Sequence, residues 1–169
     1  MIKQPNYEWH EDGIACCTLF YNNLQFKGVA YCHPDDEDMM SKLTGQIIAE
    51  YRATMQYLRH IRDNEIQPQL KALLQLYYSM KHSKQFTPRG YEARMLYKQI
   101  KKLQNDLNAV KEEIAITQKN LKEYIDDKEK NYQAIRKHRE GQNWLIFLWI
   151  LTLSIGNSQR SELFWKFLF

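Results

Sequence analysis

The sequence predicts a mainly α-helical protein of the α+β class, in which a small β-hairpin precedes a long antiparallel helical hairpin or coiled coil. Two runs of strand-forming residues flank an Asn-Asn pair between residues 14 and 32. Apolar residues recur with helical spacing between residues 48 and 80, and with a strict 3.5-residue repeat between residues 96 and 124. The 169-residue chain contains only 6 Gly and 4 Pro, which favours long uninterrupted elements.

The strand pattern of residues 14–32, IACCTLFYNNLQFKGVAYC, predicts a two-stranded ribbon. Asparagine tolerates the positive φ angles of a tight turn, so Asn22 and Asn23 are expected to form the turn and Tyr21 to pair with Leu24. The apolar face is then Ala15, Cys17, Leu19, Tyr21, Leu24, Phe26 and Ala30, and the opposite face carries Cys16, Thr18, Gln25 and Lys27. A ribbon alone is marginally stable, so the apolar face is expected to pack on helices or on another subunit.

The first arm of the helical hairpin is expected to begin at the acidic residues 35–38. These residues follow Pro34, and both proline and acidic side chains suit the first turn of a helix. Pro68 interrupts the apolar pattern of this arm, so a kink or a short break is expected near residues 64–67. Residues 83–90, SKQFTPRG, are expected to form the turn between the two arms.

The second arm carries the clearest pattern in the chain. The repeat consists of Leu96, Ile100, Leu103, Leu107, Val110, Ile114, Thr117, Leu121 and Tyr124. This alternation of four and three residues specifies a coiled-coil seam. Two long helices joined by a short turn pack most simply side by side in opposite directions, which would place Arg59 and Arg62 near Glu112 and Glu113.

The pattern divides the chain into a β-hairpin region (residues 1–36), a helical hairpin (residues 37–142) and an apolar tail (residues 143–169). The apolar run of the tail, residues 144–155, has 12 residues, whereas a transmembrane helix needs about 20. Three interpretations of the tail stay open. These are membrane association through residues 144–155, burial against the helices or in an oligomer, and foreign sequence joined to the domain.

Composition and charge narrow the class of protein. With 44% hydrophobic and 26% charged residues, the chain is not of the disordered class. Three cysteines, and a start (Met-Ile-Lys-Gln) unlike a signal peptide, predict a reduced cytoplasmic protein. Residues 1–50 hold 3 basic and 8 acidic side chains, and residues 51–111 hold 12 basic and 4 acidic ones. The basic middle is expected to meet an anionic surface, or to neutralise the acidic part within an oligomer.

No catalytic motif is found in the sequence, and we expect no enzymatic activity, no cofactor and no metal site. Phosphate-binding loops, nucleophile elbows and zinc-protease motifs are absent from the sequence. Cys16 and Cys17 are adjacent on a strand and point to opposite faces, so packed thiols are expected rather than a zinc site with Cys32 and His33. The acidic residues beside His33 are interpreted as a helix start, with a weak divalent-cation site as the alternative.

Basic and aromatic residues gather around the predicted turn. We call this set the basic tip; it consists of Lys81, His82, Lys84, Phe86, Arg89, Tyr91, Arg94, Lys98, Lys101 and Lys102. Such a mixture suits an acidic groove of a protein, where Tyr and Arg are common anchors, or the phosphates and bases of a nucleic acid. A solvated helix end whose tyrosines pack inward is the third interpretation.

The stretch GVAYCHPDDEDMMSKLTGQIIAEYRA (residues 28–53), the segment DNEIQPQLKALLQLYYSM and the heptad helix resemble small proteins encoded by phages and prophages of Gram-positive bacteria. The resemblance covers about residues 1–140 and includes no catalytic motif. It implies a cytoplasmic phage accessory protein, a class whose members often inhibit CRISPR or other host defence systems.

We therefore expect a non-enzymatic protein that binds and inhibits a host protein or complex through the basic tip. A homodimer or a higher homo-oligomer is the expected assembly, because a two-helix hairpin leaves much of each seam uncovered. The alternatives are a nucleic-acid-binding protein that uses the same tip, and a membrane-anchored exclusion factor that uses the apolar tail.

Overall fold

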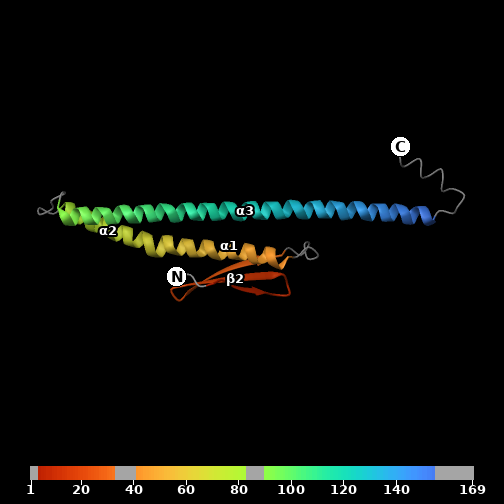
Figure 1. Ribbon diagram of the computed structural model, residues 1–169, viewed down its shortest axis with the longest axis horizontal. Helices are drawn as coiled ribbons and strands as arrows, with labels where there is room; N and C mark the ends of the chain where they lie inside the picture. Colours follow the sequence, from red (N-terminus) through yellow and green to blue (C-terminus); the bar gives the residue numbers. More distant parts are fainter. Residues whose placement is uncertain (1–3, 33–40, 83–89, 155–169) are drawn as a thin grey trace, which may run out of the picture. The chain divides into compact units, whose positions relative to one another are not determined.

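The computed structural model describes residues 4–32, 41–82 and 90–154 (Figure 1). These residues form a three-stranded antiparallel sheet followed by helices, so the expected α+β class with mainly helical content is confirmed. The chain divides into two compact units, Met1–Tyr124 and Ile125–Phe169. The sheet, the first helices and the first half of the last helix belong to the first unit.

The sheet contains one more strand than the sequence predicted. Strands β2 (Ile14–Tyr21) and β3 (Leu24–Tyr31) pair in the expected register, and Asn22 and Asn23 have φ angles of 47° and 64°. Strand β1 (Asn6–Trp9) pairs with the other edge of β2, so the expected two-stranded ribbon is a three-stranded sheet. A four-residue strand shows too little alternation to be recognised from sequence, and its position depends on pairing with β2.

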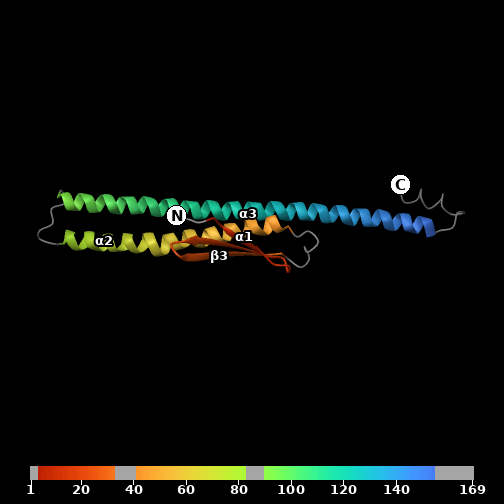
Figure 2. The same ribbon diagram turned by 60° about the horizontal axis from the view of Figure 1, so that its bottom comes forward.

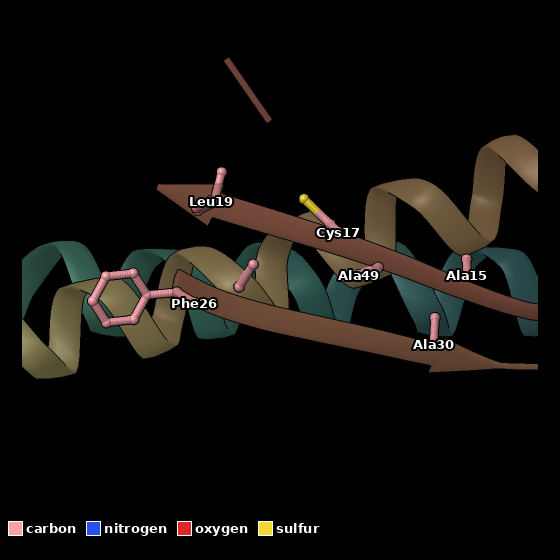
Figure 3. Close-up of a cluster of buried hydrophobic side chains, with 7 residues drawn as sticks. Ala15, Cys17, Leu19, Phe26, Ala30 and Ala49 are labelled. Carbon is pink, nitrogen blue, oxygen red and sulfur yellow. The ribbon is translucent and has the colours of Figure 1, made fainter. Parts of the chain in front are cut away.

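One face of the sheet forms the hydrophobic core, largely as expected. Figure 3 shows its buried side chains, which are Ala15, Cys17, Leu19, Phe26 and Ala30 together with Ala49 from helix α1. Two residues differ in burial from the other residues of their face. Leu24 is 44% exposed, because it lies at the turn end of the ribbon. Thr18 lies on the opposite face, as expected, but it is buried because it is on the central strand between paired residues of β1 and β3.

Helix α1 (Lys42–His60) packs across β2 and β3 (Figure 2). Its N-cap is Ser41, whose Oγ accepts a hydrogen bond from the Thr44 amide at 3.3 Å. The acidic residues expected to open this helix lie outside the described residues. The face of α1 on the sheet is built from Ala49 and Ala53, because small side chains allow the helix backbone to approach the sheet closely.

The expected kink near residues 64–67 is a change of helix type rather than a break. The π-helix η2 (Ile61–Ile66) joins α1 directly to helix α2 (Gln67–Lys81). In η2 the Gln67 amide donates to the Arg62 carbonyl five residues earlier. In an α-helix, the ring of Pro68 would clash with the carbonyl four residues before it, and a widened turn relieves this clash.

Helix α3 runs from Tyr91 to Ser154 without interruption, so the boundary expected at residues 142–143 falls inside a helix. The predicted burial of the seam residues on one side of this helix is confirmed. Leu96, Ile100, Ile114 and Thr117 are buried, and the other expected seam residues through Tyr124 are half-buried. Between residues 101 and 123 every side chain outside the seam is exposed. Helix α2 ends and α3 begins on either side of the expected turn, whose residues 83–89 lie outside the described residues.

None of the helices within the described ranges combines the length and the apolar character that crossing a membrane requires.

Candidate functional site

The described part of the basic tip lies on two helix ends. Lys81 closes α2 and His82 is its C-cap, and both side chains are exposed. Tyr91, the first residue of α3, is 72% exposed. Lys84, Phe86 and Arg89 lie outside the described residues.

The remaining four cations of the tip follow one side of α3. We call Arg94, Lys98, Lys101 and Lys102 the basic ridge; all four side chains are exposed. At roughly 100° per residue, they lie on the side of the helix opposite the buried Ala93, Leu96 and Ile100. The sequence from 90 to 111 includes only two acidic residues, Glu92 and Asp106. The ridge is therefore a solvent-facing line of positive charge.

Exposed aromatic rings accompany this charge. Tyr78 near the end of α2 is 56% exposed, and its ring meets that of Tyr77 edge to face with centroids 6.1 Å apart. Tyr97, within the ridge segment of α3, is 58% exposed. Amphipathic rings next to cations are the side chains that most often anchor protein interfaces.

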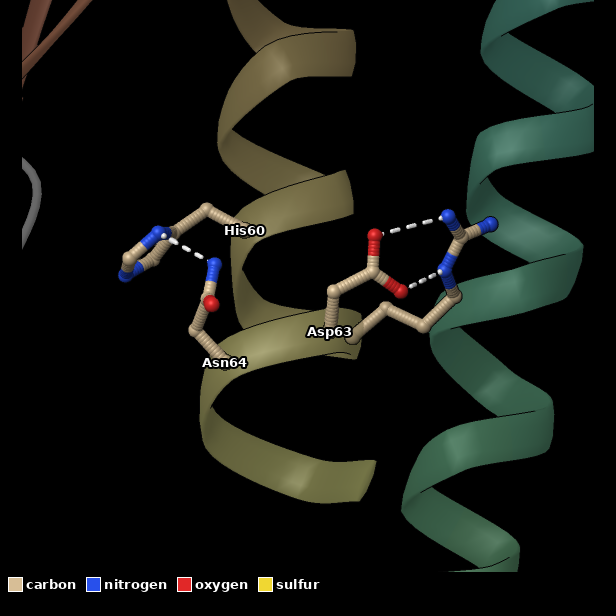
Figure 4. A network of polar contacts seen from close by, with 4 residues as sticks. His60, Asp63 and Asn64 are labelled. Carbon is tan, nitrogen blue, oxygen red and sulfur yellow. Dashed lines mark hydrogen bonds and ion pairs between the residues drawn. The ribbon is translucent and has the colours of Figure 1, made fainter. Parts of the chain in front are cut away.

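A second polar cluster surrounds η2, and the sequence did not predict it. The Tyr21 hydroxyl at the end of β2 donates to a Glu65 carboxylate oxygen at 3.3 Å, and His60 Nε2 lies 3.9 Å from the other oxygen. Asn64 contacts His60 Nδ1 at 3.0 Å on one side of the helix, whereas Asp63 points to another side (Figure 4). Residues five apart do not share a face of an α-helix, so no sequence signal linked His60 with Glu65.

Aromatic packing joins this cluster to the sheet. The Tyr57 ring lies edge to face with Tyr21 (5.1 Å) and Phe26 (5.7 Å), and the His60 ring lies 5.2 Å from Phe26. Burial, followed by the nearby Tyr21, Glu65 and Glu113, raises the pKa of Tyr57. These rings pack against one another and so join the β-hairpin to α1. The polar groups of the cluster lie at the edge of this aromatic packing.

The described cysteines and acidic residues are of residue types that can act as metal ligands. Burial and the charge of Glu50 raise the pKa of the Cys17 thiol to about 11, so this thiol stays protonated at neutral pH. Among residues 4–32, 41–82 and 90–154, no three His, Cys, Asp or Glu side chains gather as a metal site would require. The cluster around His33 lies outside the described residues.

Comparison with known proteins gives no relative of this chain. No protein-family model, no curated protein and no solved structure matches it. The resemblance to phage-encoded proteins is neither supported nor contradicted by these comparisons, and it stays a prediction.

Proposed function

We propose that this chain is a non-enzymatic interaction protein that binds an acidic surface of a partner protein through the basic tip. The observation that carries the proposal is the basic ridge, four exposed cations on the side of α3 opposite its buried stripe. If the resemblance to phage accessory proteins holds, the partner is a host protein complex, such as a CRISPR or other defence complex, which the protein inhibits.

We further propose that α1, η2 and α2 pack antiparallel to the first half of α3 as a helical hairpin. Two observations support this arrangement. The stripe of α3 is sheltered through Tyr124, where the first compact unit ends. The charge of Glu113 in α3 is one of the causes that raise the pKa of Tyr57 in α1, as is expected where the two helices lie side by side. In such a hairpin, the end of α2 and the start of α3 present the basic tip together.

Protein binding is favoured over nucleic-acid binding by the character of the surface. Tyr91 and Tyr97 lie in the same segment of α3 as the ridge and are exposed, and tyrosine combined with arginine is typical of protein interfaces. In the proposed hairpin, the exposed Tyr78 at the end of α2 would join them. A nucleic-acid partner would use the same cations on phosphates, and its affinity would fall steeply with salt. A pull-down with and without nuclease distinguishes the two kinds of partner. We also propose a homodimer or higher oligomer, because exposed apolar side chains such as Leu76 and Met95 flank the tip.

The experiment compares three versions of the full chain as bait in lysate of a Gram-positive host, with and without nuclease. The first is the unchanged chain. The ridge variant combines Arg94→Glu, Lys98→Glu, Lys101→Glu and Lys102→Glu. The control variant reverses four other exposed lysines of α3, Lys111, Lys119, Lys122 and Lys130, to Glu, so that both variants change net charge equally.

A protein that resists nuclease, stays with the control variant and is lost from the ridge variant would support the proposal. Retention of the same protein by the ridge variant would refute it. Recovery of nucleic acid alone, lost on nuclease treatment, would replace the proposal with the nucleic-acid alternative.

A further inference from the structure

The apolar side chains of the helical segment from Lys42 to Lys81 shift by one residue in their spacing at η2. We call their angular position around the helix axis the phase. Leu58 before the π-helix and Ile66 at its end are both buried, with 4% and 8% of their surface exposed. They are eight residues apart, and in a regular α-helix they would lie roughly 80° apart around the axis. The residue seven positions after Leu58, which an α-helix would place in line with it, is the charged Glu65.

The π-helix removes this mismatch because its wider turn takes up one extra residue. After η2, the half-buried Leu70, Leu73, Tyr77 and Met80 continue from Ile66 with regular spacing. Without the extra residue in a wide turn, each of them would be turned by roughly 100° away from the side of the helix on which Leu58 lies.

Three contacts hold the wide turn in place. The amide of Gln67 donates to the carbonyl of Arg62, which is the bond that defines a π-helix. Glu65 connects to His60 five residues earlier and to Tyr21 at the tip of the β-hairpin. Pro68 disfavours a regular α-helix across the same residues.

We propose that η2 is a phase-correcting element, fixed to the β-hairpin by Glu65, that sets the direction in which α2 presents its basic end. Lys81 and His82 follow η2 in one continuous helix, so a phase change of one residue would turn both by roughly 100° relative to the sheet. The statement about their direction rests on the proposed function, whereas the phase correction does not.

The experiment removes one residue from the full chain at two places. The test variant combines deletion of the exposed Asn64 with Pro68→Ala, because a regular α-helix through residue 68 requires a residue other than proline. The single substitution Pro68→Ala is the reference for this variant. The control deletion removes Gln104, an exposed residue of α3 between the seam residues Leu103 and Leu107. Thermal unfolding is followed by circular dichroism.

If η2 absorbs an extra residue, deletion of Asn64 should leave Tm within about 3 °C of the reference, because Leu58 and the apolar residues from Ile66 onwards stay on the same side of the helix. Deletion of Gln104 should lower Tm by about 10 °C or more, since no wide turn of α3 can absorb it. Equal losses of Tm for the two deletions would overturn the phase correction.

Attachment by Glu65 has its own readout, which needs no partner protein. Glu65→Ala should speed amide hydrogen exchange at the non-proline residues between 62 and 70 by about tenfold or more. The matched control is Glu50→Ala, which removes another Tyr–Glu pair, with Tyr7, that links the sheet to α1 at 2.8 Å. Unchanged exchange at residues 62–70 in the Glu65 variant would refute the attachment, whatever the outcome of the partner-binding experiment.

Discussion

At the scale of single residues, Gly28 decides how closely the sheet and α1 approach each other. A Cβ atom at this position would overlap the carbonyl oxygen of Ala49 and the amide nitrogen of Ala53, which are both backbone atoms. Neither can move without displacing α1. The close approach brings Ala49 and Ala53 into the core with the alanines of the ribbon.

We therefore expect Gly28→Ala to lower the free energy of unfolding by about 3 kcal/mol, near the upper end of the cost of overpacking a core. Urea denaturation of the full chain measures the change. Gly141→Ala is the control, because a Cβ at Gly141 in α3 meets no atom within 4 Å. In a helix interior this control should be neutral or stabilising by up to about 1 kcal/mol. Equal effects of the two substitutions would contradict the close approach.

The ionisation of Cys17 depends on the fold. Its buried thiol has a pKa of about 11, above the ordinary value of 9.0, because burial and Glu50 disfavour the thiolate. The folded state is stabilised by this shift below pH 9, and it loses the stabilisation as the pH rises through 11. Tyr7 behaves alike, because burial and its hydrogen bond to Glu50 raise its pKa to about 12.

At pH 8.5, iodoacetamide should alkylate the half-buried Cys16 and Cys32 but leave Cys17 unmodified, since the thiolate is the reactive form. Mass spectrometry of the intact protein should show two added groups under native conditions and three in urea. Rapid addition of the third group without denaturant would show that Cys17 is accessible.

At the scale of elements, the long helix α3 has one sheltered side. Ile114 is 7% exposed, whereas Ile116, two residues further along the same helix, is 51% exposed. The two isoleucines have the same side chain and nearly the same position in the chain. They therefore form a matched pair that separates burial from helix propensity.

Ile114→Ala should lower the free energy of unfolding by about 2–5 kcal/mol, because it removes a buried side chain and leaves a cavity. Ile116→Ala should change it by less than about 0.5 kcal/mol, as is usual at an exposed site. Denaturant unfolding measures both variants. If the proposed hairpin is right, hydrogen exchange in α1 should also rise in the Ile114 variant. An unchanged exchange rate in α1 would argue against packing of α1 on α3.

At the scale of the whole molecule, burial is unevenly distributed over the elements of the first compact unit. The core cluster consists of residues from β2, β3 and α1, whereas none of the residues of α2 is fully buried. Elements with few buried contacts open more easily than a packed core. The sheet and α1 thus form a well-packed module. Helix α2, with the proposed binding end, is connected to this module by η2.

Much of the fold could be predicted from local patterns. Asn22 and Asn23 determine the register of β2 and β3, because a two-residue turn leaves one way to pair the flanking strands. The buried side of α3 could also be predicted, because a 3.5-residue repeat over four heptads places the apolar residues on one side of the helix. For the candidate site, exposure of the basic ridge followed from its position between seam residues.

The sequence by itself determined the mainly helical class, the ribbon register, the sheltered stripe of α3 and the accumulation of charge beside it, because each depends on neighbours along the chain. Only the tertiary structure decided the third strand, the alanine face of α1, the burial of Thr18 and the contact between His60 and Glu65. These depend on residues far apart in sequence, or on the helix phase accumulated over many residues. A local pattern contains neither kind of information.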